Sequence, residues 1–458
     1  MKKIISTNPS KNYEVIGKVK ASTKKEIVQK VADANHVKED WRNLGVRNRI
    51  GLVRKAYLAY KKNQEKIAGL ITKEVGTPIT ECKDEVAWNW SYIDWFLEHV
   101  ESAIKDEITY DDGKSLHKII YEPLGTAVVI TPWNLPFDLF IWGVIPNLLV
   151  GNTVVYKAAA ECVLTGKLLE EISSKVGFPK GVFSFIHGDS QEGKFLTEQD
   201  IDLVWFTGST KVGRSIYELA GKKFIKALLE MGGSNPAIIF DDVDMDSLID
   251  NVTAKRFMFC GQTCDADKRI IVHENKYDEF IEKVEKKLST FVIGDPEDSK
   301  TTMGPLVSIK QLNLLISQVD DAINKGAKVV YGGKRPKGLK GAYYLPTILT
   351  DIKRNMKVWN EEVFGPVLPI MTFRTEEEAV YIANDTVYGL GSQVFTKDKN
   401  RIKRISGLID AGNIDFNGVG HFKPFNPFGG YKHSGMGREH GIVGFRELCQ
   451  IKTVSMEK

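Results

Sequence analysis

Cys264 is the residue of this sequence whose type and surroundings could do covalent chemistry. It lies in a segment of small and polar residues, Cys260-Gly261-Gln262-Thr263-Cys264-Asp265-Ala266. A thiolate can add to an aldehyde, and the thiohemiacetal that forms is a good hydride donor. The product is a thioester, which water must then hydrolyse. Such a reaction needs a thiol of lowered pKa, donors for an oxyanion, a hydride acceptor and a general base.

Two polar residues upstream could supply the oxyanion donor and the base. Asn134 follows an apolar run in a proline-flanked turn, where its amide could donate to an oxyanion together with the backbone N–H of Cys264. One such donor is typically worth about 3–4 kcal/mol of barrier. Glu230 ends the apolar run 225–229 and precedes two glycines, so its carboxylate could activate water. Taken alone, an Asn in a turn and a Glu at a strand end are both ordinary.

The cysteines also allow structural interpretations. A buried structural role is the commoner fate of a free cysteine. The chain has five cysteines at wide spacing, which favours a reducing compartment over a disulfide framework. Cys260 and Cys264 could form half of a metal site, but no second Cys/His pair with zinc-like spacing follows, so we expect no metal.

Bulk composition is that of a globular protein. The 458 residues predict two or three domains, and 42% of them are hydrophobic and 27% charged. The net charge of +4 and the lack of a Lys/Arg block argue against nucleic-acid binding. The most apolar stretch, residues 130–156, is broken by prolines and polar residues, and the N-terminal apolar run is too short for a signal peptide. We therefore expect no membrane span and a cytoplasmic location.

The first hundred residues have helical patterns. Thr23-Lys24-Lys25-Glu26 has the form of a capping box before apolar residues at helical spacing. Further helices are expected over about residues 47–70 and 80–103.

From Gly125 the pattern changes to short β runs that alternate with helices such as 164–176 and 212–219. The strand candidates are residues 126–131, 152–157, 182–187, 203–207, 225–230 and 237–240. This alternation predicts right-handed βαβ units and a parallel sheet.

A second α/β series is expected to begin near Gly233. Its candidate strands are residues 269–273, 328–331, 393–396 and 413–417, and its candidate helices are 277–288 and 309–325. Two more short strands are expected at 117–121 and 450–456.

A doubly wound sheet binds dinucleotides at the carboxyl ends of its strands. Here those ends carry Thr131 with Trp133, Lys157, and the turn that begins at Gly208. No Gly-x-Gly-x-x-Gly fingerprint is present. Gly208-Ser209-Thr210 instead follows a strand and opens a helix, where free N–H groups and the helix dipole would favour a phosphate. Alone, this turn is as well explained by an ordinary N-cap.

Several segments together resemble the aldehyde dehydrogenase family, from about Asn8-Pro9 to Thr453. They are Pro132-Trp133-Asn134, Glu230-Met231-Gly232-Gly233, the Cys264 segment, Gly294-Asp295-Pro296, Gly304-Pro305-Leu306, Glu362-Val363-Phe364-Gly365-Pro366, Asn384-Asp385, Tyr388-Gly389-Leu390 and the tail Pro427 to Glu439. Their order and separations are similar to those of the family. The short N-terminus and the ending look most like bacterial succinate-semialdehyde dehydrogenases.

The resemblance implies NAD(P)-dependent oxidation of an aldehyde to an acid. It implies that Cys264 is the nucleophile, Asn134 an oxyanion donor and Glu230 the base. The cofactor contacts that it implies are Thr131, Trp133, Lys157, Gly208, Ser209, Glu362 and Phe364. The substrate contacts are Leu135, Leu139, Trp142 and Phe428, of which the first three are also spaced like one face of a core helix.

The resemblance also implies a fold. A Rossmann-like dinucleotide-binding domain would comprise residues 1–105 and 123–232, and an α/β catalytic domain residues 233–433. A small β oligomerisation flap would combine residues 106–122 with 442–458. Projecting edge strands pair readily with another subunit, so we expect a homodimer or homotetramer.

Two positions depart from the family pattern. Ala160 stands where the family often has a Glu on the adenosine ribose, which favours acceptance of NADP beside NAD. Met258 stands where some succinate-semialdehyde dehydrogenases have an Arg for the substrate carboxylate. The nearest basic residues are Lys255, Arg256, His421 and Lys423. Succinate semialdehyde or another short aldehyde is the expected substrate.

Three alternatives remain. A CoA-acylating aldehyde dehydrogenase would not need Glu230 to activate water. A thiol hydrolase without a redox cofactor would need a paired histidine, and none of the eight histidines falls in a recognisable Cys/His signature. A non-enzymatic scaffold of the same fold would be expected to lack Cys264 or Glu230.

Overall fold

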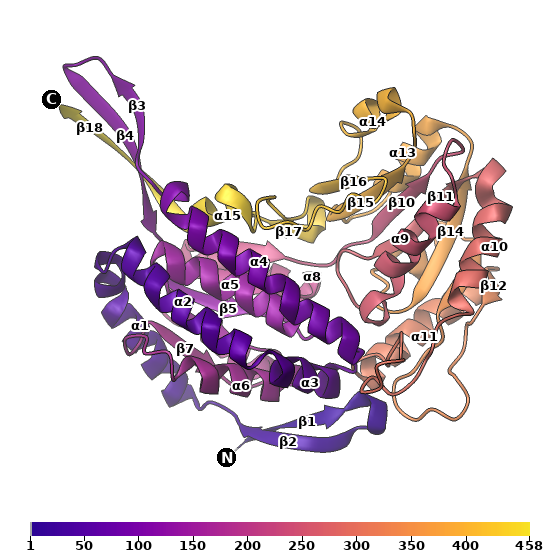
Figure 1. The fold of residues 1–458 in the computed structure, drawn as a ribbon, viewed down its shortest axis with the longest axis horizontal. Helices are drawn as coiled ribbons and strands as arrows, with labels where there is room; N and C mark the ends of the chain where they lie inside the picture. Colours follow the sequence, from indigo (N-terminus) through magenta and orange to yellow (C-terminus); the bar gives the residue numbers. More distant parts are fainter. Residues whose placement is uncertain (1) are drawn as a thin grey trace.

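The computed structural model describes residues 2–458, so Met1, the first residue of the predicted first domain, lies outside it. It has two large sheets, a three-stranded sheet and an N-terminal hairpin. Figure 1 shows the two large sheets in separate lobes, with the early part of the chain (indigo to magenta) in one and the later part (rose to orange) in the other. The three-stranded sheet projects from the first lobe.

The first large sheet has six strands in the order β17-β9-β8-β5-β6-β7. Five are successive parallel strands: β5 (Thr126–Ile130), β6 (Thr153–Lys157), β7 (Phe183–Ile186), β8 (Leu203–Thr207) and β9 (Lys226–Glu230). Helices α5 (Pro136–Val150), α6 (Val163–Ser173), α7 (Ser190–Thr197) and α8 (Thr210–Lys223) alternate with them. The strands are apolar runs because helices cover both faces of such a sheet. The short β17 (Gly435–Met436) joins antiparallel to β9.

The second large sheet has seven strands in the order β12-β13-β14-β11-β10-β15-β16. Its strands are β10 (Asn235–Ile239), β11 (Asp267–His273), β12 (Lys328–Tyr331), β13 (Thr347–Thr350), β14 (Val367–Phe373), β15 (Gly391–Phe395) and β16 (Asn413–Phe416). Its helices are α9 (Asp246–Phe257), α10 (Tyr277–Leu288), α11 (Ile309–Asn324), α12 (Lys357–Asn360), α13 (Glu376–Asn384) and α14 (Lys399–Ile405). Only β12 pairs antiparallel.

The expected α/β architecture with parallel sheets is therefore confirmed, but the N-terminal region differs from the prediction. Residues 3–20 form a hairpin of β1 (Lys3–Asn8) and β2 (Glu14–Lys20) rather than a helix, with Asn12 and Tyr13 in left-handed conformations at its turn. The helix expected over 47–70 is two helices, α2 (Val46–Lys62) and α3 (Gln64–Val75), which meet at Asn63.

The other N-terminal helices agree with the sequence pattern. Helix α1 (Lys24–Asn43) begins with the predicted capping box, in which Thr23 accepts from the Glu26 N–H and Glu26 accepts from the Thr23 N–H. Helix α4 (Ile79–Ala103) packs on α5, so its buried face forms part of the core of the first lobe.

The third sheet has the order β18-β4-β3 and joins residues 107–123 to the C-terminal strand. Strand β4 (Ser115–Pro123) lies between β3 (Glu107–Asp111) and β18 (Cys449–Glu457), which follows α15 (Gly441–Glu447). Apolar residues on its outer strands are exposed, including Ile108 and Ile451. The division into two domains and a flap stays a prediction. Within residues 2–458 no helix has the length and apolar character that a membrane crossing would require.

Candidate active site

One cavity of about 690 Å³ brings together the residues that the sequence singled out. The segments after β5 and β8 and the end of β9 line it from the first lobe, and α9, the Cys264 segment and the loop around Phe364 line it from the second. Cys264 is half-buried at its wall. Nearly all predicted site residues line this cavity: Trp133, Asn134, Leu135, Leu139, Trp142, Gly208, Ser209, Glu230, Cys264, Glu362, Phe364 and Phe428. Thr131 and Lys157 do not.

A strained turn positions Cys264. Helix α9 is followed by a short 3-10 segment in which Phe259 and Cys260 have φ of 54° and 58°. Such conformations cost about 1–3 kcal/mol each and persist only where surrounding contacts fix them. The Phe259 N–H donates to Glu81 Oε2 at 2.9 Å, and the side-chain Oε1 of Gln262 accepts from the Val307 N–H at 3.0 Å. The turn is therefore anchored from two other segments.

Arg256 supports the same turn from behind. Its fully buried guanidinium donates to the backbone carbonyls of Val367 at 2.7 Å and Val363 at 3.2 Å, and to that of Gly365. It does not line the cavity. Arg256 was one of the basic residues considered for a substrate carboxylate, and that hypothesis is wrong because its donors already bind the protein backbone.

Asn134 and Glu230 reach the cavity from the first lobe. Asn134 lies in the turn between β5 and α5, and its buried side chain makes no hydrogen bond to another described residue. Glu230 ends β9, and neither of its carboxyl oxygens has a partner among those residues. Gly429 leaves room for this carboxyl, since a Cβ there would lie 2.7 Å from Glu230 Oε1. Burial and the neighbouring Glu439 raise the pKa of Glu230 well above its usual value, against a lowering by Arg438.

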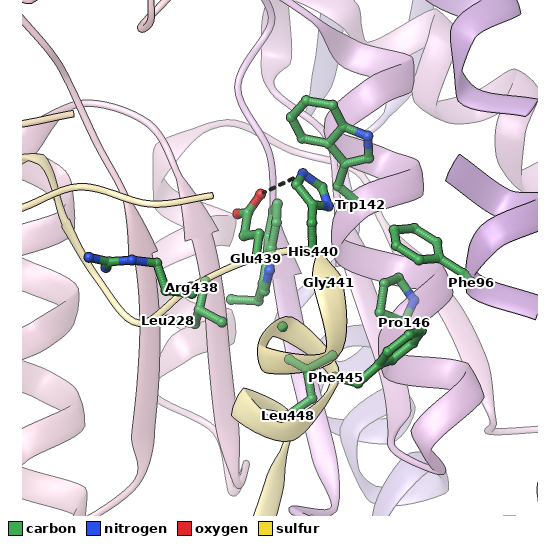
Figure 2. Close-up of a pocket in the computed structure, with 12 residues that line it drawn as sticks. Phe96, Trp142, Pro146, Leu228, Arg438, Glu439, His440, Gly441, Phe445 and Leu448 are labelled. Carbon is green, nitrogen blue, oxygen red and sulfur yellow. Dashed lines mark ion pairs between the residues drawn. The ribbon is translucent and has the colours of Figure 1, made fainter. Parts of the chain in front are cut away.

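Glu439, whose charge acts on the pKa of Glu230, forms a second buried group with His440, and Figure 2 shows these two side chains next to each other. Both Glu439 oxygens and both His440 ring nitrogens lack hydrogen-bond partners in the described chain, and Glu439 Oε2 lies 3.9 Å from His440 Nε2. Burial raises the pKa of Glu439 and lowers that of His440 to about 3. The imidazole is therefore neutral, and it packs edge-on against Trp142 at 4.4 Å. The tail motif contained Glu439, with His440 directly after it, and two adjacent titratable residues within a glycine-rich segment were the unused signal.

Lys268 is a buried cation that the sequence analysis missed. Its Nζ donates to Gly233 O at 2.8 Å, Cys264 O at 3.0 Å and Glu362 Oε1 at 2.5 Å. It also lies 5.2 Å from the centre of the Phe364 ring. The charged run Asp265-Ala266-Asp267-Lys268-Arg269 directly after the thiol was the available signal.

Lys268 also dominates the charges around the thiol. Burial raises the pKa of Cys264 above its usual value, and Lys268 is the group that opposes this most. Asp265, Glu362 and Glu230 add to the rise. The resting group is therefore the thiol, and the ammonium of Lys268 is the feature that would favour its ionisation.

The carboxyl ends of β5, β6 and β8 form a site that fits a dinucleotide. The Ser209 side chain precedes α8 without capping it, so the first N–H groups of this helix are open to a phosphate. Lys157 is buried and donates only to Ala158 O at 3.1 Å, and the backbone of Gly193 lies close to its side chain. The Thr207 hydroxyl is buried without a partner. Thr131 differs, because its hydroxyl is paired with Tyr156 at 2.9 Å.

The residues expected to contact the substrate surround the mouth of the same cavity. Leu135 occupies the N-cap position of α5, and Leu139 and Trp142 follow on the helix face that lines the cavity. Trp142 stacks on Phe422 at 6.2 Å, and Phe422 lies 5.1 Å from Phe428. The spacing of Leu135, Leu139 and Trp142 would also suit a helix face packed in a core. In the structure these residues line the cavity.

Comparisons with known proteins agree with this geometry. The model of the aldehyde dehydrogenase family matches residues 1–454. The chain belongs to the aldehyde dehydrogenase family. It is 34% identical over 449 residues to the NADP(+) succinate-semialdehyde dehydrogenase GabD of Escherichia coli, covering 97% of this chain and 92% of that protein. It is 33% identical over 450 residues to a glutarate-semialdehyde dehydrogenase of Pseudomonas aeruginosa, covering 98% and 93%.

Solved structures extend the family assignment to the fold. A crystal structure of an Escherichia coli NADP-dependent enzyme matches with a TM-score of 0.96 and 33% identity, covering 100% of this chain and 95% of that one. Betaine aldehyde dehydrogenase from Staphylococcus aureus in complex with NAD+ matches with a TM-score of 0.94 and 32% identity, covering 99% and 91%. The aldehyde dehydrogenase fold is thus confirmed. Members of this family are oxidoreductases that use NAD or NADP.

Proposed function

We propose that this aldehyde dehydrogenase oxidises its aldehyde to the free carboxylic acid through a thioester on Cys264. The observation that carries the proposal is the shared cavity, in which a half-buried thiol faces the same space as Asn134 and the unpartnered carboxyl of Glu230. Each group that the chemistry requires is supplied by a different segment, and each segment is held in place by buried contacts.

The first half of the reaction forms the thioester. Cys264 Sγ adds to the carbonyl carbon, and the carbonyl oxygen becomes an oxyanion that the Asn134 amide and the backbone N–H of Cys264 bind. The cofactor, when bound, accepts the hydride from this carbon. Lys268 lies on the carbonyl side of the Cys264 peptide, where its charge favours the thiolate that attacks.

The second half needs a base. Glu230 takes a proton from water as the water oxygen attacks the thioester carbon. The C–S bond then breaks, the acid leaves and the thiolate is restored. Because no group in residues 2–458 forms a hydrogen bond with them, the Glu230 oxygens are available for this water. This feature also favours hydrolysis over transfer of the acyl group to CoA, which needs no such base.

The cofactor contacts are proposed on the same basis. Trp133 and Ser209 would bind the phosphates at the start of α8, Lys157 the adenosine ribose, and Glu362 with Phe364 the nicotinamide end, with Thr131 and Gly208 shaping the strand ends. Ala160 carries no charge to repel a 2′-phosphate, so we expect NADP to be accepted beside NAD. A kcat/KM for NAD more than about 100-fold above that for NADP would refute this expectation.

The substrate is proposed to be a short aldehyde, with Leu135, Leu139, Trp142 and Phe428 around its chain, and succinate semialdehyde is the candidate that the panel below must test. We also propose a homodimer or homotetramer in which the exposed edges of the β18-β4-β3 sheet pair with another subunit, and a cytoplasmic location. A monomer by light scattering at micromolar concentration would refute the oligomer.

The test is formation of NAD(P)H by the purified protein over a panel of aldehydes, with each cofactor. We expect turnover to the free acid without CoA, and none with Cys264→Ala. Equal turnover in that variant would overturn the thioester route, and acyl-CoA as the product would overturn hydrolysis. A thiol hydrolase is disfavoured because no histidine is among the described residues that line the cavity.

A further inference from the structure

The substrate side of the cavity has an apolar lining. Trp88, Leu139, Trp142, Met258, Phe422 and Phe428 line it beyond the thiol. The rings of Trp142, Phe422 and Phe428 form a continuous group, because Trp142 packs on Phe422 and Phe422 packs on Phe428. A lining of this kind binds the hydrocarbon part of a substrate by removing it from water.

The charged groups of the lining are mostly acidic. Asp138, Glu230, Asp265 and Glu439 contribute carboxyl groups, and Lys255 and Lys423 are the two lysines of this lining in the described chain. Glu362 also lines the cavity, but it lies on the cofactor side and is paired with Lys268. A negatively charged group on the substrate would therefore need one of the two lysines as its partner.

Lys255 is already occupied. Its Nζ lies 3.0 Å from Asp265 Oδ2 and 3.3 Å from Asp415 Oδ2. His421 lies between the same two acids, with Nδ1 at 2.8 Å from Asp415 and Nε2 at 3.5 Å from Asp265. One ammonium thus faces two carboxyl groups, with the buried acid Asp267 nearby. We call Lys255, Asp265, Asp415 and His421 the quenching network.

Met258 and Lys423 do not supply a free cation in place of Lys255. Met258 is 37% exposed at the cavity wall and carries no charge. Lys423 lies on an exposed loop at the mouth, where solvent and salt screen its attraction for a distant anion. A carboxylate drawn into the cavity would lose its contact with water and would find no free cation among the described residues of the lining.

We propose that this cavity selects aldehydes with an uncharged, apolar body and rejects aldehydes that carry a carboxylate, and that the quenching network makes this selection. The inference rests on the proposed function and narrows its substrate class. It separates this chain from the relatives whose names refer to succinate and glutarate semialdehydes.

The first experiment compares matched substrates with the intact enzyme. We expect kcat/KM for the methyl ester of succinate semialdehyde, and for hexanal, to exceed that for succinate semialdehyde by about 100-fold or more. From butanal to hexanal each methylene should raise kcat/KM roughly fourfold. Equal or faster oxidation of succinate semialdehyde, or preference for an aldehyde with an ammonium group, would overturn the proposal.

The second experiment releases Lys255. Asp415→Asn removes one of its two acids without changing a residue that lines the cavity, and should shift the ratio of kcat/KM toward succinate semialdehyde by about tenfold. Asp351→Asn is the matched control, because it breaks an exposed ion pair with Lys328 of 2.9 Å and should leave the ratio unchanged. An unchanged ratio in a folded Asp415→Asn enzyme would contradict the role of the network.

A third variant guards against misfolding. Met258→Arg places a cation at an exposed wall position and should shift the same ratio in the same direction. The outcomes also separate the two proposals. If no aldehyde yields NAD(P)H although Cys264 is intact, the proposed function fails, whereas a preference for succinate semialdehyde leaves that function standing and refutes only the substrate class.

Discussion

The buried acids on the two sides of the cavity differ in what they contact. On the side of the base, Glu230 and Glu439 have no hydrogen-bond partner within the described residues. On the side of the thiol, Asp265 and Glu362 each have an ammonium within 3.0 Å. An unpaired buried carboxyl favours its neutral form, whereas an ion pair fixes the position of a carboxyl. The cavity thus combines a side whose carboxyl groups lack partners among the described residues with a side whose carboxyl groups are paired.

The strongest test of this difference is Glu230→Gln. The variant keeps the shape of the base but cannot accept a proton, so turnover should fall by about 10²–10⁴-fold. Thioester formation does not need this base, so a first equivalent of NAD(P)H should still form rapidly in a stopped-flow measurement. Cys264→Ala is the control that should abolish this burst. A variant that turns over at the normal rate would show that another group activates water.

Lys268→Met tests the side of the thiol, where the carboxyl groups are paired with ammonium groups. It removes the ammonium that donates to Glu362 and to two carbonyls, so that Glu362 keeps only the Gly233 N–H, and breaking a buried pair in this way typically costs about 3–5 kcal/mol of stability. Because Lys268 lowers the pKa of Cys264, the rate of thiol alkylation should rise only at higher pH than in the parent enzyme. The KM for the cofactor should increase about tenfold, since Glu362 loses its anchor. Lys268→Arg keeps the charge and serves as the control, and an unshifted alkylation profile in Lys268→Met would remove Lys268 from the electrostatics of the thiol.

Glu439→Gln is expected to give a smaller effect, on the side of the base. The neighbouring acid raises the pKa of Glu230, so its removal should lower that pKa and make the base effective at lower pH. The acid limb of the kcat profile should therefore move to lower pH, measured with a substrate for which hydrolysis limits the rate. His440→Asn is a matched control, because the neutral imidazole contributes no charge above a pKa of about 3. A profile that stays in place would mean that the two acids do not interact.

Local signals predicted much of the fold and of the site. The Thr23 capping box, the apolar strands and the turn after β8 are determined by neighbouring residues, so their patterns identify them. The N-terminal hairpin was missed because its alternation is short and its left-handed turn at Asn12 and Tyr13 lacks glycine. The break at Asn63 likewise has no proline or glycine to mark it.

The missed site residues depend on contacts between distant parts of the chain. Lys268 reaches Glu362 across 94 positions, and Asp265 and Asp415 meet at Lys255 only after the second sheet has formed. The sequence contained these charges but not their pairing. The family motifs identified Cys264, Glu230 and Asn134 as candidates, while the availability of Lys255 and Arg256 for a substrate could be judged only from their partners.

The C-terminal segment returns to the first lobe. The enzyme can therefore fold completely only after the end of the chain has been synthesised. Strand β17 pairs with β9 beside Glu230, and β18 pairs with β4, so residues near the end of the chain finish two sheets that began in its first half. A ribosome that has translated the first lobe has yet to synthesise the segment that carries Glu439 and Phe428. The order of translation therefore leaves closure of the cavity, with its reactive thiol, to the last step of folding.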